Sequence, residues 1–158
     1  MKHVLISITH GNLSNHFNQP FSLRVDYFKG IKMFNLKNLP PIHHLLNGHD
    51  LHWDKDLAQI HVKYIALESF TNPRGTVEGG MICAMLDDAM GILAALNKTE
   101  KPAATVNLNI DFLRPCHVGN VETKAWFIKQ GSKVLNIESE AWQQGKLIAK
   151  CSSAFLVL

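Results

Sequence analysis

The sequence predicts an α+β domain in which an antiparallel sheet of about six strands curls around one long buried helix. Residues 79–96 carry apolar side chains at every helical angle, and Asp87 and Asp88 are their only charged residues. This pattern is typical of a helix that is buried on all sides. Four later runs alternate apolar and polar residues, as strands with one buried face do. A helix of this kind needs a sheet around it, so we expect both to share one core.

Composition limits the possible function classes. The chain has 158 residues, 46% of them apolar, which suits one domain with one core. We assign residues 33–158 to that domain and residues 1–32 to an amino-terminal extension of unclear structure. The net charge of +3 comes without a basic run, which argues against a nucleic-acid or membrane partner and still suits a phosphorylated ligand. Three widely spaced cysteines indicate reduced thiols in a soluble, cytoplasmic protein.

The segment before the long helix predicts one short helix and two strands. Proline opens the stretch 39–48 and Asn-Gly closes it, with apolar Ile42, Leu45 and Leu46 at helical spacing. Two antiparallel strands follow over 49–53 and 57–67, joined by a charged turn.

The segment after the long helix predicts four strands. The first is the clearest, because every second residue is apolar and its opposite face is polar. Three-residue links that contain glycine separate the last three runs and indicate hairpins, hence an antiparallel meander. The expected strands are 105–112, 121–129, 133–142 and 146–158.

Two glycines and two acids on the long helix are the candidate functional residues. Gly79 and Gly80 open the helix, where backbone N–H groups lack intrahelical acceptors and the helix dipole is positive. Such donors can polarise a carbonyl group. The alternative is tight packing of the helix start against the sheet, with Thr76 as N-cap. Asp87 and Asp88 are poor helix formers that need a partner or a function if buried.

These residues also carry a resemblance to a known family. Asn72, Gly75, Glu78-Gly79-Gly80 and Asp87 fall at the spacing seen in hotdog-fold acyl-CoA thioesterases of the PaaI-type, phenylacetate-pathway branch. The stretch Asn109 to Pro115 followed by Gly119 is similar to the family's next strand and its exit. Together with the order of elements, the resemblance covers residues 39–158 and implies a hotdog fold.

The resemblance also implies catalytic roles. Asp87 would act as general base on water or as direct nucleophile, in hydrolysis of a coenzyme A thioester to free acid and coenzyme A. The Gly79 N–H and the Asn72 side chain would hold the thioester oxygen. Thr105 matches a position whose hydroxyl orients the water, and the alternative is an ordinary β-branched strand residue.

Further residues are candidates for substrate contact. Arg74 and Arg114 could bind the coenzyme A phosphates, because Arg forms bidentate phosphate contacts, or be solvated surface charges. Gly80 adjoins the proposed oxyanion site. For Asp88 we favour a structural role, as a buried acid tied to a backbone or Arg partner; the same alternative applies to Asp87.

Glu78 departs from the family pattern, which has His at this position. A carboxylate suits the positive end of a helix, but a negative charge there opposes a developing oxyanion. This departure keeps open a second hypothesis, a non-catalytic or weakly active hotdog module that binds an acyl or aromatic ligand.

No cofactor is expected beyond coenzyme A as part of the substrate. The nine histidines lack a recognised zinc spacing, so we expect surface or strand-end histidines and no metal site. The sequence has no nucleophile elbow, P-loop or dinucleotide fingerprint.

The spacing along the helix predicts self-association. Gly79 and Asp87 are eight residues apart, about 12 Å along a helix and too far to act on one carbonyl. A two-fold dimer with antiparallel helices would bring Gly79 of one subunit towards Asp87 of the other. The resemblance likewise implies a homodimer, or two dimers paired into a homotetramer.

Overall fold

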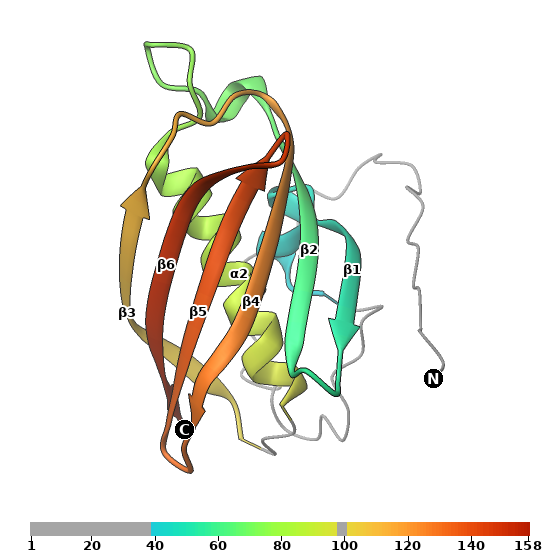
Figure 1. Ribbon diagram of the computed structural model, residues 1–158, viewed down its shortest axis with the longest axis vertical. Coiled ribbons are helices and arrows are strands. Elements are labelled where there is room, and N and C mark those ends of the chain that lie inside the picture. The colour runs from blue at the N-terminus through green and yellow to red at the C-terminus, as the bar shows by residue number, and fades with distance from the viewer. Residues whose placement is uncertain (1–38, 98–100) are drawn as a thin grey trace, which may run out of the picture.

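The computed structural model describes residues 39–97 and 101–158, and Figure 1 shows α2 lying behind a six-stranded sheet. The predicted extension over residues 1–32 lies outside the described residues. The elements are α1 (Pro41–Leu45), β1 (His49–Asp54), β2 (Gln59–Ala66), the 3-10 helix η2 (Glu68–Phe70), α2 (Gly79–Leu96), β3 (Ala103–Phe112), β4 (Gly119–Gln130), β5 (Val134–Gln143) and β6 (Lys146–Val157).

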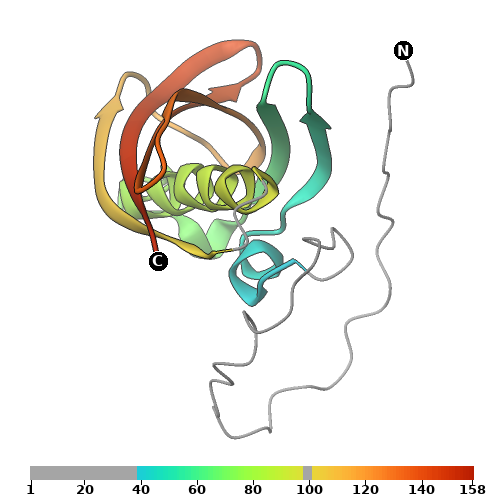
Figure 2. The ribbon, with the colours of Figure 1, turned by 90° about the horizontal axis from the view of Figure 1, so that it is seen from below.

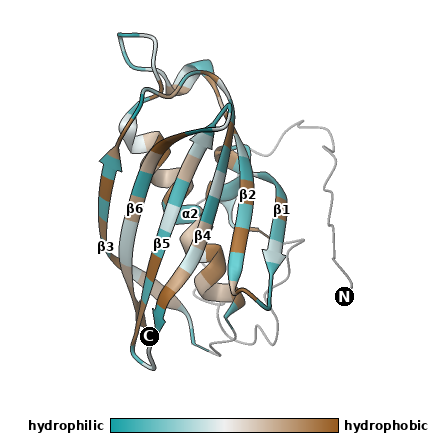
Figure 3. Ribbon diagram, viewed as in Figure 1, coloured by the Kyte–Doolittle hydropathy of each residue, from teal (hydrophilic) through white to brown (hydrophobic). Residues whose placement is uncertain are grey.

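The sheet is antiparallel throughout, with the strand order β1-β2-β4-β5-β6-β3. Figure 3 shows hydrophilic and hydrophobic bands alternating along its strands, as the sequence predicts. The last three strands form the expected meander. β3 does not join it beside β4, because β3 pairs with β6 at the far edge and β4 pairs with β2. The link between β3 and β4 contains Pro115 and is longer than the hairpin links, so it can cross the end of the sheet.

Helix α2 is the centre of the core. It spans the predicted residues Gly79–Leu96, and the sheet arches over it, with β1 and β3 at the two ends of the arc (Figure 2). By length and composition α2 could cross a membrane, yet 56% of it is buried inside this domain. It is thus the core helix of this domain.

One face of α2 departs from the expectation of burial on all sides. Small residues spaced three or four apart are half-buried or exposed within the described chain. β3 reaches Asp87 through Thr105, but these residues all keep part of their surface exposed, so the sheet covers the helix only in part. We call this the small-residue face: Gly80, Cys83, Ala84, Asp87, Gly91 and Ala95.

The short helix also differs in which residues it buries. α1 forms where proline and Asn-Gly predict it, but Ile42 and Leu45 are exposed by 43% and 62%. The buried residues are Leu39, His43 and Leu46. The prediction that the histidines lie at the surface or at strand ends is therefore wrong for His43, which has a buried acidic partner described below.

Candidate active site

The structure brings together Asp87 of α2 and Thr105 of β3. The Thr105 hydroxyl donates a hydrogen bond of 2.9 Å to Oδ1 of Asp87. Asp87 is half-buried and Thr105 is exposed in the single chain. The pair therefore lies at an accessible surface, and the second carboxylate oxygen of Asp87 is available to meet another group.

A β-bulge is what aims Thr105 at the helix. Thr105 is opposite the buried Phe155, whereas Asn107 is opposite Ala154, so β3 has one extra residue at Val106. Val106 is consequently 64% exposed. Bulges commonly redirect side chains next to functional sites. Without this one, strict alternation would place Thr105 on the outer polar face with Asn107 and Asn109.

The surroundings of Asp87 raise the pKa of its carboxyl group. Burial raises the pKa of its carboxyl group, the hydrogen bond from Thr105 lowers it, and the nearby Asp88 raises it again, with a net increase. A raised pKa moves a carboxylate towards the range in which it can accept and return a proton near neutral pH.

The start of α2 supplies backbone donors. Glu78 is the N-cap residue and its side chain makes no capping hydrogen bond, so Thr76 does not cap the helix as the alternative interpretation had it. The Glu78 N–H donates to Phe70 O at 2.8 Å. The amides of Gly79 and Gly80 come next, in the first turn, where a helix offers them no acceptor.

Space around the two glycines differs. A Cβ on Gly79 would lie 2.9 Å from Cζ of Phe112, so an aromatic ring packs directly on this residue. A Cβ on Gly80 would meet no atom within 4 Å. Close packing thus gives Gly79 a structural reason to be glycine, while Gly80 faces open space beside it.

Asn72 is engaged in its own loop. Its Oδ1 accepts a hydrogen bond from the Arg74 amide at 2.9 Å, and its Nδ2 donates to Thr76 Oγ1, also at 2.9 Å. These bonds hold the turn that contains Gly75, whose φ is +76°. One hydrogen of the Asn72 amide remains for another acceptor.

The remaining charged candidates lie at the surface. Glu78, Arg74 and Arg114 are all exposed. The Arg114 guanidinium donates through Nη1 to Leu147 O at 2.7 Å, which fastens it to β6 and leaves its other N–H groups unused in that bond.

Asp88 lies on another side of the helix from Asp87. Its side chain is 2% exposed, and its Oδ2 accepts hydrogen bonds from His43 Nδ1 at 2.7 Å and from the Tyr64 hydroxyl at 2.9 Å. The prediction of a structural buried acid fits this placement, but its partners are His43 and Tyr64 rather than the backbone or Arg. No spacing in the sequence links these three residues.

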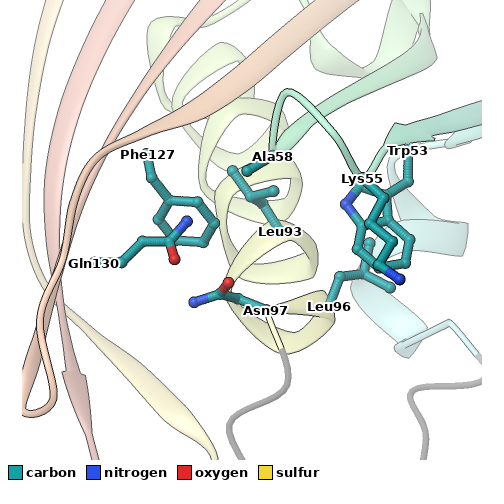
Figure 4. Close-up of a pocket in the computed structure, with 8 residues that line it drawn as sticks. All are labelled: Trp53, Lys55, Ala58, Leu93, Leu96, Asn97, Phe127 and Gln130. Carbon is teal, nitrogen blue, oxygen red and sulfur yellow. The ribbon is translucent and has the colours of Figure 1, made fainter.

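A separate pocket of about 260 Å³ lies near the carboxyl-terminal end of α2. Figure 4 shows Phe127 and Gln130 on one side of it, Trp53 and Lys55 on the other, and α2 between them. Its first α2 residue, Leu93, is six positions beyond Asp87, about 9 Å along the axis. The pocket is therefore distinct from the Asp87–Thr105 pair.

The cysteines and histidines give no sign of a metal centre. Within residues 39–97 and 101–158, no three or more His, Cys, Asp or Glu side chains are grouped so that they could hold a metal ion. Cys83, Cys116 and Cys151 are free thiols; Cys83 is half-buried and the others are buried.

Comparison with known proteins identifies the family. The chain is similar to the crystal structure of a phenylacetic acid degradation-related protein from Ralstonia eutropha, with 30% identity and a TM-score of 0.72, over 84% of this chain and 97% of that one. The family model described as the thioesterase superfamily matches residues 74–149, a range that includes Gly79, Asp87 and Thr105. The chain belongs to the thioesterase superfamily. It is a thioester hydrolase with the hotdog fold that the sequence predicts.

Two further relatives agree with this assignment. An uncharacterized acyl-CoA thioester hydrolase of Zymomonas mobilis is 31% identical to this thioesterase over 84 residues, which are 52% of this chain and 56% of the relative. The phenylacetic acid degradation protein PaaI from Thermus thermophilus, solved as a mutant, is 24% identical and has a TM-score of 0.66 over 75% of this chain and all of that one. At that identity, PaaI supports the fold alone.

Proposed function

We propose that this thioesterase hydrolyses a coenzyme A thioester in the cytoplasm, with Asp87 as the base that activates water. The observation that carries the proposal is the Asp87–Thr105 hydrogen bond. It holds Oδ1 in place and leaves Oδ2 to accept a proton. The similarity to an acyl-CoA thioester hydrolase supports coenzyme A as the leaving group.

The reaction follows from these groups. Asp87 Oδ2 takes a proton from a water molecule while the water oxygen bonds to the thioester carbon. The carbonyl oxygen becomes an oxyanion that accepts hydrogen bonds from the Gly79 N–H and from the free hydrogen of Asn72 Nδ2. When the intermediate collapses, the carbon–sulfur bond breaks and Asp87 returns the proton to the thiolate of coenzyme A. No metal or redox cofactor enters this scheme.

The scheme requires two subunits. Gly79 and Asp87 are separated by about 12 Å along the continuous helix α2, so one chain cannot place both on one carbonyl. Two features support a second copy as the partner: the small-residue face of α2 is half-buried or exposed in the single chain, and β3 is an edge strand with exposed Val106 and Phe112. Exposed edge strands are ready to pair with another chain. We propose a homodimer, or a dimer of dimers, with two equivalent sites.

The surface residues take supporting roles. Gly80 gives the thioester room beside the helix start, because no atom lies within 4 Å of the position its Cβ would occupy. Arg74 and the free N–H groups of Arg114 are exposed and can bind phosphates of coenzyme A. Asp88 does not contact substrate in this scheme, because its carboxylate is buried and bonded within the core.

Glu78 favours a second candidate function. Its carboxylate adjoins the Gly79 and Gly80 amides and opposes an oxyanion there, so a hotdog module that binds an acyl or aromatic ligand with little turnover is the alternative. Glu78 is exposed and makes no capping bond, which leaves its side chain free to turn away from the site.

The test is turnover of a panel of acyl-CoA thioesters, followed with a thiol reagent, for wild type, Asp87→Asn and Asp111→Asn. Asp111 is an exposed carboxylate on the same strand as Thr105 and serves as the matched control. We expect Asp87→Asn to lose on the order of 10²–10⁴-fold in kcat, and Asp111→Asn to keep its rate. Binding without coenzyme A release by wild type would establish the alternative function. Full activity of Asp87→Asn would remove Asp87 from the mechanism.

A further inference from the structure

The two consecutive acids of α2 tie the helix to opposite parts of the sheet. Asp87 bonds to Thr105 on β3, the last strand of the arc, and Asp88 bonds to Tyr64 on β2, the second strand. Neighbouring helix residues point about 100° apart. A rotation of α2 about its axis would therefore break both attachments together.

The attachment of Asp88 is more extensive than a single bond. His43, Tyr64 and Asp88 come from α1, β2 and α2, and the exposed fractions of these residues are 1%, 0% and 8%. Both hydrogen bonds converge on Asp88 Oδ2, and the imidazole of His43 packs edge-on against Tyr64, with ring centroids 5.8 Å apart. We call these three residues the Asp88 cluster.

Stability alone is a weak explanation for the Asp88 cluster. Buried ionic groups lose their hydration, and well-packed apolar residues in their place are often neutral or stabilising. Buried polar networks do, however, fix one arrangement of the elements they join. Asp88 is one residue from Asp87, so a network that holds Asp88 in one position also limits the positions that Asp87 can take.

We propose that Asp88, held by His43 and Tyr64, is a positioning residue that fixes the rotation of α2 and thereby aims Asp87 at Thr105. The same arrangement sets the negative charge of Asp88 beside the reacting carboxylate of Asp87. The inference rests on the proposed role of Asp87 in hydrolysis. Asp88 itself does not touch the substrate.

Among the titratable groups around Asp87, Asp88 is the one whose charge acts on its carboxyl group. Cys83 on α2 and Cys151 on β6 lie near it, but burial raises the pKa of both thiols, that of Cys151 to about 11, so both are uncharged at neutral pH. Thr105 on β3 does not titrate. Burial raises the pKa of Asp87 most, the Thr105 hydrogen bond lowers it, and the charge of Asp88 raises it further. Burial, followed by the charge of Asp88, also raises the pKa of Tyr64 well above its ordinary value, which keeps that phenol neutral.

The experiment compares Asp88→Asn, Tyr64→Phe and Thr105→Val. Two readouts are taken for each variant: the titration midpoint of the Asp87 carboxyl carbon by NMR, and the pH dependence of kcat. Asp88→Asn removes the neighbouring charge, so the midpoint and the acidic limb of kcat should move to lower pH. Thr105→Val removes the stabilising hydrogen bond, so both should move to higher pH. Tyr64→Phe keeps the charge but removes one attachment, so kcat should fall by about tenfold with KM unchanged, as for a misplaced catalytic group.

The outcomes separate the inference from the proposed function. If Asp88→Asn folds and neither the midpoint nor the acidic limb moves, the inference is wrong. If Asp88→Asn does not fold, Tyr64→Phe decides: an unchanged kcat overturns the inference, and a selective loss of kcat supports it. The NMR midpoint reads Asp87 without any turnover. A shifted midpoint in a protein that releases no coenzyme A would therefore support the coupling of Asp88 to Asp87 and refute hydrolysis.

Discussion

Replacement of Gly48 by Ala tests how tightly the Asp88 cluster is packed. A Cβ on Gly48 would lie 2.2, 2.3 and 2.6 Å from Cε1, Nε2 and Nδ1 of His43. Ordinary contacts of this type begin at 3.4 Å, so the imidazole must move by more than 1 Å. His43 is 1% exposed, so its imidazole can move only against other core side chains. The φ angle of Gly48 is not in the positive range, so the change introduces no backbone strain.

Two costs follow from this displacement. Overpacking a core costs about 1–3 kcal/mol, and leaving a buried hydrogen-bonding group without its partner costs about 1–3 kcal/mol more. Their sum, about 2–6 kcal/mol, is a large part of the 5–15 kcal/mol by which domains are typically stable. We expect urea unfolding to show this loss in free energy and Tm to fall by on the order of 10 °C.

A double-mutant cycle supplies the control. In a His43→Ala background the ring is gone, so Gly48→Ala should then have almost no further effect on the free energy of unfolding. If Gly48→Ala leaves the wild-type stability unchanged, or costs the same in both backgrounds, the proposed contact with His43 is wrong.

Two further predictions concern pH and assembly. Burial, followed by the charge of Lys124, lowers the pKa of His61 below its usual 6.5. Just below pH 6.5 the unfolded chain therefore binds more protons than the folded chain, so the free energy of unfolding should fall as the pH drops through that range. Urea unfolding at pH 7.5 and pH 5 measures this fall, and it should be smaller in His61→Gln. Gly91 lies on the small-residue face with no atom within 4 Å of its added Cβ. Gly91→Ala should stabilise an isolated helix by about 0.5–1 kcal/mol but weaken self-association in sedimentation, and unchanged association would show that no second copy packs there.

Periodicity accounts for most of the fold that the sequence predicts. The bounds of α2 follow from an apolar run that ends at Asn97, and the strands follow from alternation, because both patterns depend on neighbours in the chain. Alternation fails at Val106. The extra residue at Val106 reverses the alternation, so Thr105 points inward instead of outward. Such a bulge depends on the pairing of β3 with β6 and not on the local sequence.

The partners of Asp88 could not be predicted from the sequence. The helix pattern predicts that a buried acid needs a partner, but His43 is 45 residues away and Tyr64 is 24. Only the fold brings them together. The same pattern misleads at α1, where the apolar Ile42 and Leu45 are exposed and the polar His43 is buried, because a charged partner is available to His43 inside the core.

The proposed two-subunit site predicts complementation between two inactive variants. Asp87→Asn removes the proposed base. Gly79→Ala adds a methyl group 2.9 Å from Cζ of the half-exposed Phe112 ring, which should disturb the first turn of α2 that carries the proposed oxyanion donor. Each variant alone should be inactive. In a mixed dimer, one site carries both defects and the other carries neither.

The expected activity of the mixture is therefore quantitative. If equal amounts of the two variants are unfolded, combined and refolded, half of the dimers are mixed and half of the sites in each are intact, so about a quarter of wild-type activity should return. Mixing without unfolding should restore it only as fast as subunits exchange. Because α2 is one unbroken helix, a single chain cannot bring Gly79 and Asp87 to one carbonyl. If each site instead lay within one chain, every site in the mixture would carry a defect, and no activity would return. A mixture no more active than its parents would refute the two-subunit site, even if Asp87→Asn alone had abolished turnover.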